Sequence, residues 1–204
     1  MRKSIDPAAA MLFALGVVAA STPRMAHADG ITPPPVPSDI RVPPGNELFL
    51  VGHGVGTQDY VCLPSGSGFA WTLFTPEATL FVDGQRQLTT HFFSPNPAEG
   101  GTVRATWQHS RDTSIVWAQV IHHPSTDPAF VAPNAIPWLL LQAAGVDSGP
   151  AGGDTLTATT YLQRLNTAGG IAPPTGCATP SDVGAKAFVP YTADYLFYRS
   201  DERN

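Results

Sequence analysis

The chain has 204 residues and a formal net charge of −5, from 11 basic and 16 acidic side chains. This acidic balance offers no attraction to phosphate backbones, so we expect neither nucleic acid nor an anionic membrane surface as a partner. The 19 glycines and 21 prolines favour many turns and few helices.

Residues 1–28 have the layout of a cleavable secretory signal. Arg2 and Lys3 form a basic start, residues 8–20 are an uncharged apolar run, and Ala26-His27-Ala28 places small residues where a signal peptidase cuts. The apolar run is shorter than the roughly 20 residues that a membrane span needs. We therefore expect export, with cleavage near Ala28, to the periplasm or the extracellular space, and no membrane span afterwards.

Residues 29–44 are dense in proline and predict an extended leader. A single β domain is expected over residues 45–199, followed by a short tail over 200–204. Strand-like segments are residues 47–51, 58–63, 69–74, 78–83, 86–93, 102–109, 114–122, 136–143, 155–165 and 187–197.

Two-residue alternation supports these strands. In residues 102–109, Val103, Ala105 and Trp107 fall on one face and polar side chains on the other, as in a half-buried strand. Residues 136–146 are the one place where a short helix could intrude. The pattern predicts an all-β, antiparallel β-sandwich or distorted barrel of about ten strands, with little or no helix.

Cys62 and Cys177 both lie in the part expected to be exported, where an oxidising compartment would join them. A bridge between them would close a loop long enough to contribute about 4–5 kcal/mol in the chain-entropy model. The alternatives are two buried thiols or a metal-binding pair.

Ordered fragments across residues 42–198 resemble one known family. They comprise Pro43-Pro44-Gly45-Asn46; Gly56, Gln58, Tyr60 and Cys62; Trp71 with residues 76–80; His91-Phe92; residues 136–141 and 163–167; Gly169-Gly170, Ala172-Pro173 and Gly176-Cys177; and residues 189–195. The chain resembles DUF3455, a domain of unknown function found in secreted bacterial and fungal proteins. The resemblance implies no established activity. Family members tend to read Gly-Pro-Thr-Trp after the histidine, whereas residues 94–97 here are Ser-Pro-Asn-Pro and lack that aromatic.

His91, which the resemblance singles out, is a candidate general base or metal ligand, or a structural histidine that bonds a backbone carbonyl. Glu77 is its candidate acidic partner. The chain has no Gly-x-Ser-x-Gly elbow and no Gly-x-Gly-x-x-Gly turn. Neighbouring His122 and His123 would point to opposite faces of a strand, so we expect no metal site and no cofactor.

The candidate ligand-binding residues are Tyr60, Trp138, Arg164 and Tyr195, although such rings also fill ordinary β cores and Arg164 could form a structural ion pair with Asp194. The sequence favours a non-enzymatic exported protein that binds a small molecule, a glycan or an envelope component. One alternative is a hydrolase or metal-assisted enzyme centred on His91 and Glu77. Another is a structural or stress-associated envelope protein. The oligomeric state stays open.

Overall fold

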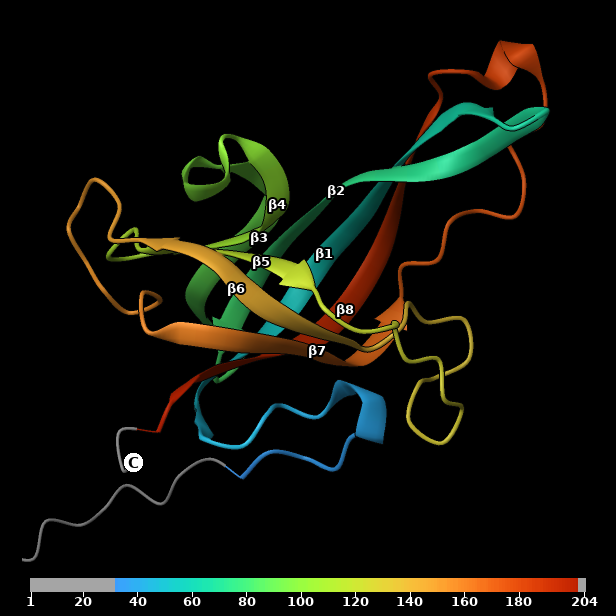
Figure 1. The fold of residues 1–204 in the computed structure, drawn as a ribbon. Coiled ribbons are helices and arrows are strands. Elements are labelled where there is room, and N and C mark those ends of the chain that lie inside the picture. Colours follow the sequence, from blue (N-terminus) through green and yellow to red (C-terminus); the bar gives the residue numbers. More distant parts are fainter. Residues whose placement is uncertain (1–31, 202–204) are drawn as a thin grey trace, which may run out of the picture.

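In the computed structural model, which describes residues 32–201, eight antiparallel strands close into a barrel (Figure 1). Each strand pairs with its neighbour in the chain, and the last strand pairs with the first. The strands are β1 (Asn46–Ser65), β2 (Gly68–Val82), β3 (Arg86–Asn96), β4 (Thr102–His109), β5 (Ile115–Val120), β6 (Leu139–Asp147), β7 (Thr159–Gly169) and β8 (Lys186–Ser200). The other elements are the 3-10 turns η1 (Ser38–Ile40), η2 (Pro97–Glu99) and η3 (Pro180–Asp182).

The predicted all-β class is confirmed, and of the two architectures considered the structure is the barrel. The expected signal peptide lies outside the described residues. No α-helix forms in residues 136–146, which instead enter β6.

The strands number eight because two pairs of expected strands are continuous. Residues 47–51 and 58–63 both belong to β1, and the glycines between them follow the extended path. Position 56 has no room for a side chain, because a Cβ there would collide with the carbonyl oxygen of Glu77 on β2, so it is occupied by Gly56. Residues 69–74 and 78–83 likewise join in β2, beside a register shift at Asp59 and Tyr60 of β1. These glycines therefore mark close strand packing and not a turn.

The barrel interior is filled at one end. Apolar side chains from all around the barrel form its core, including Leu80, Val116, Leu162 and Phe197. Leu156, in the loop between β6 and β7, is fully buried among them although it belongs to no strand. This loop therefore acts as a plug at the end where β2–β3, β4–β5 and β6–β7 connect.

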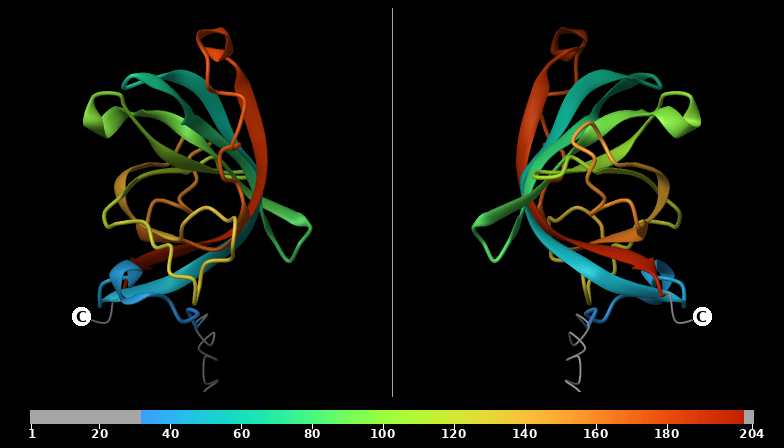
Figure 2. Two further views of the ribbon diagram at one scale, coloured as in Figure 1. Left: turned by 90° about the vertical axis from the view of Figure 1, so that its right-hand side faces the viewer. Right: turned by 90° about the vertical axis from the view of Figure 1, so that its left-hand side faces the viewer.

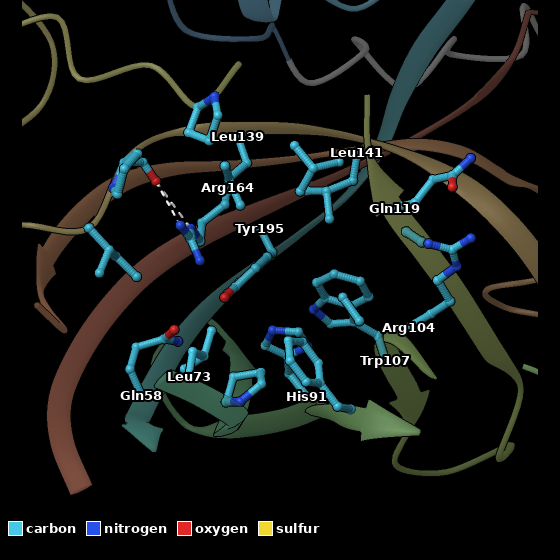
Figure 3. Close-up of a pocket in the computed structure, with 18 of the residues that line it drawn as sticks. Gln58, Leu73, His91, Arg104, Trp107, Gln119, Leu139, Leu141, Arg164 and Tyr195 are labelled. Carbon is cyan, nitrogen blue, oxygen red and sulfur yellow. Dashed lines mark hydrogen bonds between the residues drawn. The ribbon is translucent and has the colours of Figure 1, made fainter. Parts of the chain in front are cut away.

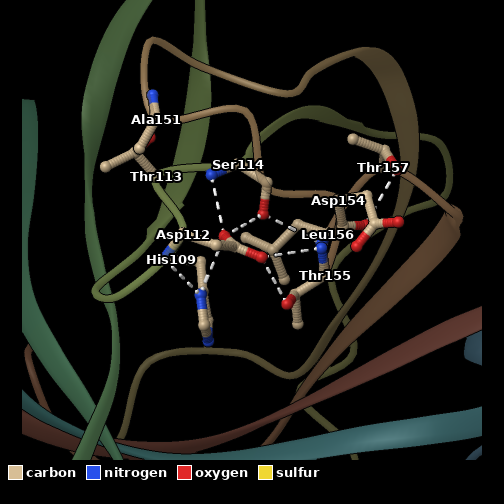
Figure 4. A network of polar contacts seen from close by, with 9 residues as sticks. All are labelled: His109, Asp112, Thr113, Ser114, Ala151, Asp154, Thr155, Leu156 and Thr157. Atoms are coloured by element: carbon tan, nitrogen blue, oxygen red, sulfur yellow. Dashed lines mark hydrogen bonds and ion pairs between the residues drawn. The ribbon is translucent and has the colours of Figure 1, made fainter.

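A carboxylate holds the plug in place (Figure 4). Asp112, in the turn between β4 and β5, accepts hydrogen bonds from Ser114 N and Oγ at 2.9 and 2.7 Å. It also accepts from Thr155 N and Oγ1 at 2.9 and 2.5 Å, and Ser114 Oγ in turn accepts from Leu156 N at 3.1 Å. The loop is thus tied to the neighbouring turn through Thr155 and through the backbone N–H of the inserted leucine.

A second apolar layer covers the outside of the barrel. The N-terminal segment, drawn in blue in Figures 1 and 2, runs along the outer surface and buries Ile40 completely. Ile40 packs with outward-facing Leu165 and Leu196, and its carbonyl accepts a hydrogen bond from Gln163 Nε2 at 2.6 Å. The proline-rich segment is therefore extended but packed against the strands.

The expected disulfide between Cys62 and Cys177 is confirmed, with Cα atoms 5.5 Å apart. The hairpin of β1 and β2 extends beyond the barrel, and the loop before β8 runs beside it (Figure 1). Trp71 Nε1 adds a 3.0 Å hydrogen bond to the carbonyl of Thr175 in that loop. The bridge therefore ties the hairpin to the β7–β8 connection.

Candidate functional site

The end of the barrel opposite the plug holds a cavity of about 500 Å³ (Figure 3). It lies where β1–β2, β3–β4, β5–β6 and β7–β8 connect, and the β5–β6 loop contributes Pro124, Ile136 and Pro137 to its wall. Closed barrels of eight strands have an interior wide enough for side chains or for one small ligand. This barrel is filled at one end and hollow at the other.

Aromatic rings form the floor of the cavity. The imidazole of His91 stacks on the indole of Trp107, with centroids 4.1 Å apart and planes 7° from parallel. Tyr195 meets the same indole edge-on at 5.5 Å, and Phe197 supports it from the filled side at 6.3 Å. Apolar walls rise from this floor on β2, β4, β5 and β6, and include Leu73, Ala105, Ala118, Leu139 and Leu141.

His91 is held in one tautomer. Its Nδ1–H donates to the Thr106 carbonyl at 2.9 Å, which leaves Nε2 as an acceptor. Burial lowers the pKa of His91 from 6.5 to about 3, against the opposing effect of this hydrogen bond and with a further contribution from the positive charge of Arg164. The imidazole is therefore neutral at physiological pH and too weak a base for efficient proton abstraction.

The predicted pair of Glu77 and His91 does not form. Ala78 of β2 lies directly opposite His91 of β3, so Glu77 points to the other face of the sheet. Glu77 is exposed on the outside, whereas His91 is 4% exposed inside the barrel. The two-residue period of a strand therefore separates the groups that the acid–base hypothesis needs together.

Arg164 of β7 brings a positive charge into the cavity. It lies between Leu139 of β6 and Tyr195 of β8 in the strand order. Its Nε and Nη2 donate to the Pro137 carbonyl at 3.3 and 2.8 Å, the dashed lines in Figure 3. The guanidinium thus anchors the β5–β6 loop while it lines the cavity.

The expected ion pair of Arg164 with Asp194 is wrong. Asp194 lies opposite Leu165 and Tyr195 lies opposite Arg164, so the carboxylate faces the outside of the barrel. There Asp194 lies 2.6 Å from His53 Nδ1, and it accepts from Asn166 Nδ2 at 2.7 Å. Within residues 32–201 the Arg164 guanidinium has no carboxylate partner.

The electrostatics of the cavity are positive. None of the 20 described residues that line it is acidic. Burial raises the pKa of Tyr60 and of Tyr195, and the positive charge of Arg164 opposes the rise in both. The Tyr60 hydroxyl donates to the Gly170 carbonyl at 2.6 Å, which fixes its ring in the wall.

Arg104 lies at the mouth of the same cavity but is neutralised. It makes a two-pronged ion pair with Glu99, at 2.8 Å from Nε and 2.6 Å from Nη2. Asn96 Nδ2 adds a 2.7 Å hydrogen bond to the same carboxylate. The hydrogen bonds from Arg104 and Asn96 lower the pKa of Glu99 to about 2, so Glu99 stays ionised beside Arg104.

Residues 43–199 match the family model described as "Protein of unknown function (DUF3455)". The chain belongs to the DUF3455 family. No curated protein and no solved structure matches it. The family description names no activity.

Three of the four predicted ligand residues of this DUF3455 domain, Tyr60, Arg164 and Tyr195, come together around the cavity. Trp138 does not, because it is buried in the outer layer and meets Phe130 edge-on at 5.8 Å. Gln58, which was predicted as part of the family pattern but not as a ligand residue, also lines the cavity. Its spacing of two residues from Tyr60 in a strand is the signal that places both on one face.

Two further observations concern the described part of the chain. Residues 32–201 contain no cluster of three or more His, Cys, Asp or Glu side chains arranged to hold a metal ion. In the same range, no helix has the length and apolar character that crossing a membrane requires.

Proposed function

We propose that this protein binds one small, largely apolar molecule inside the open end of its barrel. The observation that carries the proposal is the cavity of about 500 Å³, with its aromatic floor of His91, Trp107 and Tyr195. Sites for small molecules are concave, mostly apolar, and have volumes of roughly 300–1,000 Å³ with a few polar groups that orient the ligand. This cavity has that size and composition.

The arrangement favours binding over catalysis. A general base works best when its pKa is near the operating pH, and the pKa of His91 is about 3. The carboxylate proposed to assist it, Glu77, lies on the opposite face of the sheet. The cavity therefore offers recognition groups without a matched acid and base.

A small molecule also suits the site better than a glycan chain. A sugar-stacking platform needs an exposed aromatic face, whereas Trp107 and Tyr195 are each 1% exposed at the base of a hollow. The disulfide between Cys62 and Cys177 supports function in an oxidising compartment, either the periplasm or the extracellular space.

The test is calorimetric titration of the oxidised protein with decanoate and with its neutral amide, decanamide. We expect saturable binding of at least one probe at one site per chain. Ala105→Phe would fill the cavity from β4 and weaken that binding by about tenfold or more, because the ligand and the new ring compete for one space.

Val55→Phe is the matched control, because Val55 is 56% exposed on the outer face of β1 and the change adds a ring there. Its affinity should stay within about threefold of the wild type. If neither probe binds the wild type, or if Ala105→Phe binds as tightly as Val55→Phe, binding inside the barrel is refuted.

A further inference from the structure

We infer that the ligand is a carboxylate, whose charged group pairs with Arg164 while its apolar body lies over the aromatic floor. This inference rests on the proposed function, since it names the class of molecule that the cavity accepts. It follows from the Arg164 guanidinium in a cavity without an acidic side chain, together with buried N–H donors in the same lining.

Arg164 differs from the other described arginines in its surroundings. Arg104 and Arg199 pair with Glu99 and Glu47. The remaining arginines of residues 32–201 lie exposed on the surface: Arg41, Arg86 and Arg111. Arg164 is half-buried and faces the cavity, where it donates to the Pro137 carbonyl and lies beside the Tyr195 hydroxyl, so its neighbours there are neutral groups.

A guanidinium in this position selects against a wholly apolar ligand. A molecule that fills the cavity removes solvent from the charge, and an ion taken out of water is costly unless it gains a partner. A carboxylate provides two acceptor oxygens in the plane that matches the guanidinium fork. The ligand that fills this space must therefore carry its own negative charge.

Two buried donors strengthen the argument. Trp107 Nε1 lines the cavity, belongs to a residue that is 1% exposed, and has no hydrogen-bond partner. Gln58, 2% exposed in the same lining, has the Tyr191 hydroxyl as the neighbour of its amide. Buried polar groups in native proteins are nearly always paired. Both side chains offer N–H donors, as the guanidinium does, so the lining favours a ligand with hydrogen-bond acceptors.

The apolar body of the ligand is specified by the wall next to Arg164, where Leu139 of β6 is paired with Arg164 and Leu141 follows along the strand. In Figure 3, Leu139 and Leu141 lie above the floor formed by His91 and Trp107. Because His91 is neutral, it does not form an ion pair with the ligand, and its flat ring offers a surface for packing. A medium-chain fatty acid or an aromatic acid has the required combination of one carboxylate and one apolar body.

The experiment compares each acid with its own neutral amide, which has nearly the same shape. Decanoate and decanamide form one pair, and cinnamate and cinnamamide the other, measured by calorimetry at pH 7. We expect each carboxylate to bind about tenfold or more tightly than its amide, because only the acid supplies a charge partner for Arg164.

Two variants locate the selectivity. Arg164→Gln should weaken carboxylate binding by about thirtyfold and amide binding by less than about threefold, so the preference disappears. Arg164→Lys keeps the charge without the planar fork and should retain part of the preference. Arg199→Gln, which removes a surface ion pair with Glu47, should leave the preference unchanged. Retained amide binding shows that each variant is folded.

The outcomes separate the two proposals. Equal binding of acid and amide to the wild type would overturn the carboxylate assignment and leave binding inside the barrel standing. A preference for the acid that survives Arg164→Gln would overturn the role of Arg164. No binding of either member of both pairs would overturn the proposed function and this inference together.

Discussion

At one end of the barrel the Asp112 carboxylate receives hydrogen bonds from Ser114 and Thr155, whereas at the other the Arg164 guanidinium faces an open cavity. Both charges lie beside a loop at one end of the barrel. The first is matched by donors from this chain, and its loop inserts Leu156 into the core. The second has no matching carboxylate within residues 32–201.

The two ends therefore differ in role: the charge at one end stabilises the fold, and the charge at the other is available to bind a ligand. A charge that its own chain satisfies holds the chain together, because removing any partner leaves a buried group unpaired. A charge that the chain leaves unmatched is available to another molecule. Changes to groups that the chain pairs with itself should therefore reduce stability, and changes to Arg164 should reduce binding.

The largest loss of stability is expected when the disulfide at the cavity end is removed. Replacing Cys62 and Cys177 together by serine removes a bridge between residues 115 apart and should lower the free energy of unfolding by about 4–5 kcal/mol. Urea unfolding measures the loss. Amide hydrogen exchange should quicken first in residues 170–185; faster exchange confined to the plug loop would contradict this assignment.

Removal of the plug should have the next largest effect. Leu156→Ala leaves a void at the filled end and should cost about 3 kcal/mol in the free energy of unfolding. Val146→Ala, which trims a 43% exposed side chain on β6, is the control and should change it by less than about 0.5 kcal/mol. Similar losses for the two variants would show that Leu156 is not a plug.

Asp112 should give this end a characteristic pH dependence. Burial raises the pKa of Asp112, but the hydrogen bonds from Thr155 and Ser114 outweigh it and hold the pKa well below its ordinary value of 3.8. A carboxyl group whose pKa is lower in the folded than in the unfolded state stabilises the folded protein at pH values above the unfolded pKa. This stabilisation is lost as the pH falls through the folded pKa.

Asp112→Asn should therefore destabilise the protein by about 2 kcal/mol at pH 7, since it weakens several hydrogen bonds to a charged acceptor. The difference from the wild type should persist down to about pH 4 and shrink below it. Urea titrations across this pH range measure it, with Asp39→Asn, at an exposed position, as the control. A difference in unfolding free energy between the wild type and Asp112→Asn that grows as the pH falls would contradict this role of Asp112.

The smallest stability effect is expected for Arg104, at the mouth of the cavity. Arg104→Gln breaks a partly exposed ion pair with Glu99 and should lower the Tm by at most about 3 °C. Because Glu99 already neutralises Arg104, the variant should also retain most of the preference of Arg164 for a carboxylate. If Arg104→Gln abolished that preference, the anion would belong at the mouth and not beside Arg164.

Much of the fold could be predicted from local patterns. Alternation in residues 102–109 correctly indicated a strand, and the expected pairing of Cys62 with Cys177 is observed. The strand count was too high because glycines in β1 and Pro76 in β2 look like turns in the sequence. They are instead sites of close approach and of altered register, which depend on the neighbouring strand.

The candidate site was predictable only in part. Tyr60, Arg164 and Tyr195, predicted from the sequence as ligand-binding residues, surround one cavity, and their role in binding stays a prediction. The pairs of His91 with Glu77 and of Arg164 with Asp194 were not formed, because strand register places their members on opposite faces. Trp138 carried the same aromatic signal as Trp107, yet it packs outside the barrel.

By itself the sequence determined an all-β chain with one disulfide, since periodicity, turn residues and cysteine number act over short distances or through composition. The tertiary structure decided that the sheet closes, that Leu156 plugs one end and that Arg164 faces an open space at the other. Those features depend on register and on loops that pack against distant strands. A one-residue change of register would turn every side chain of a strand to the other face, and no local pattern records that choice.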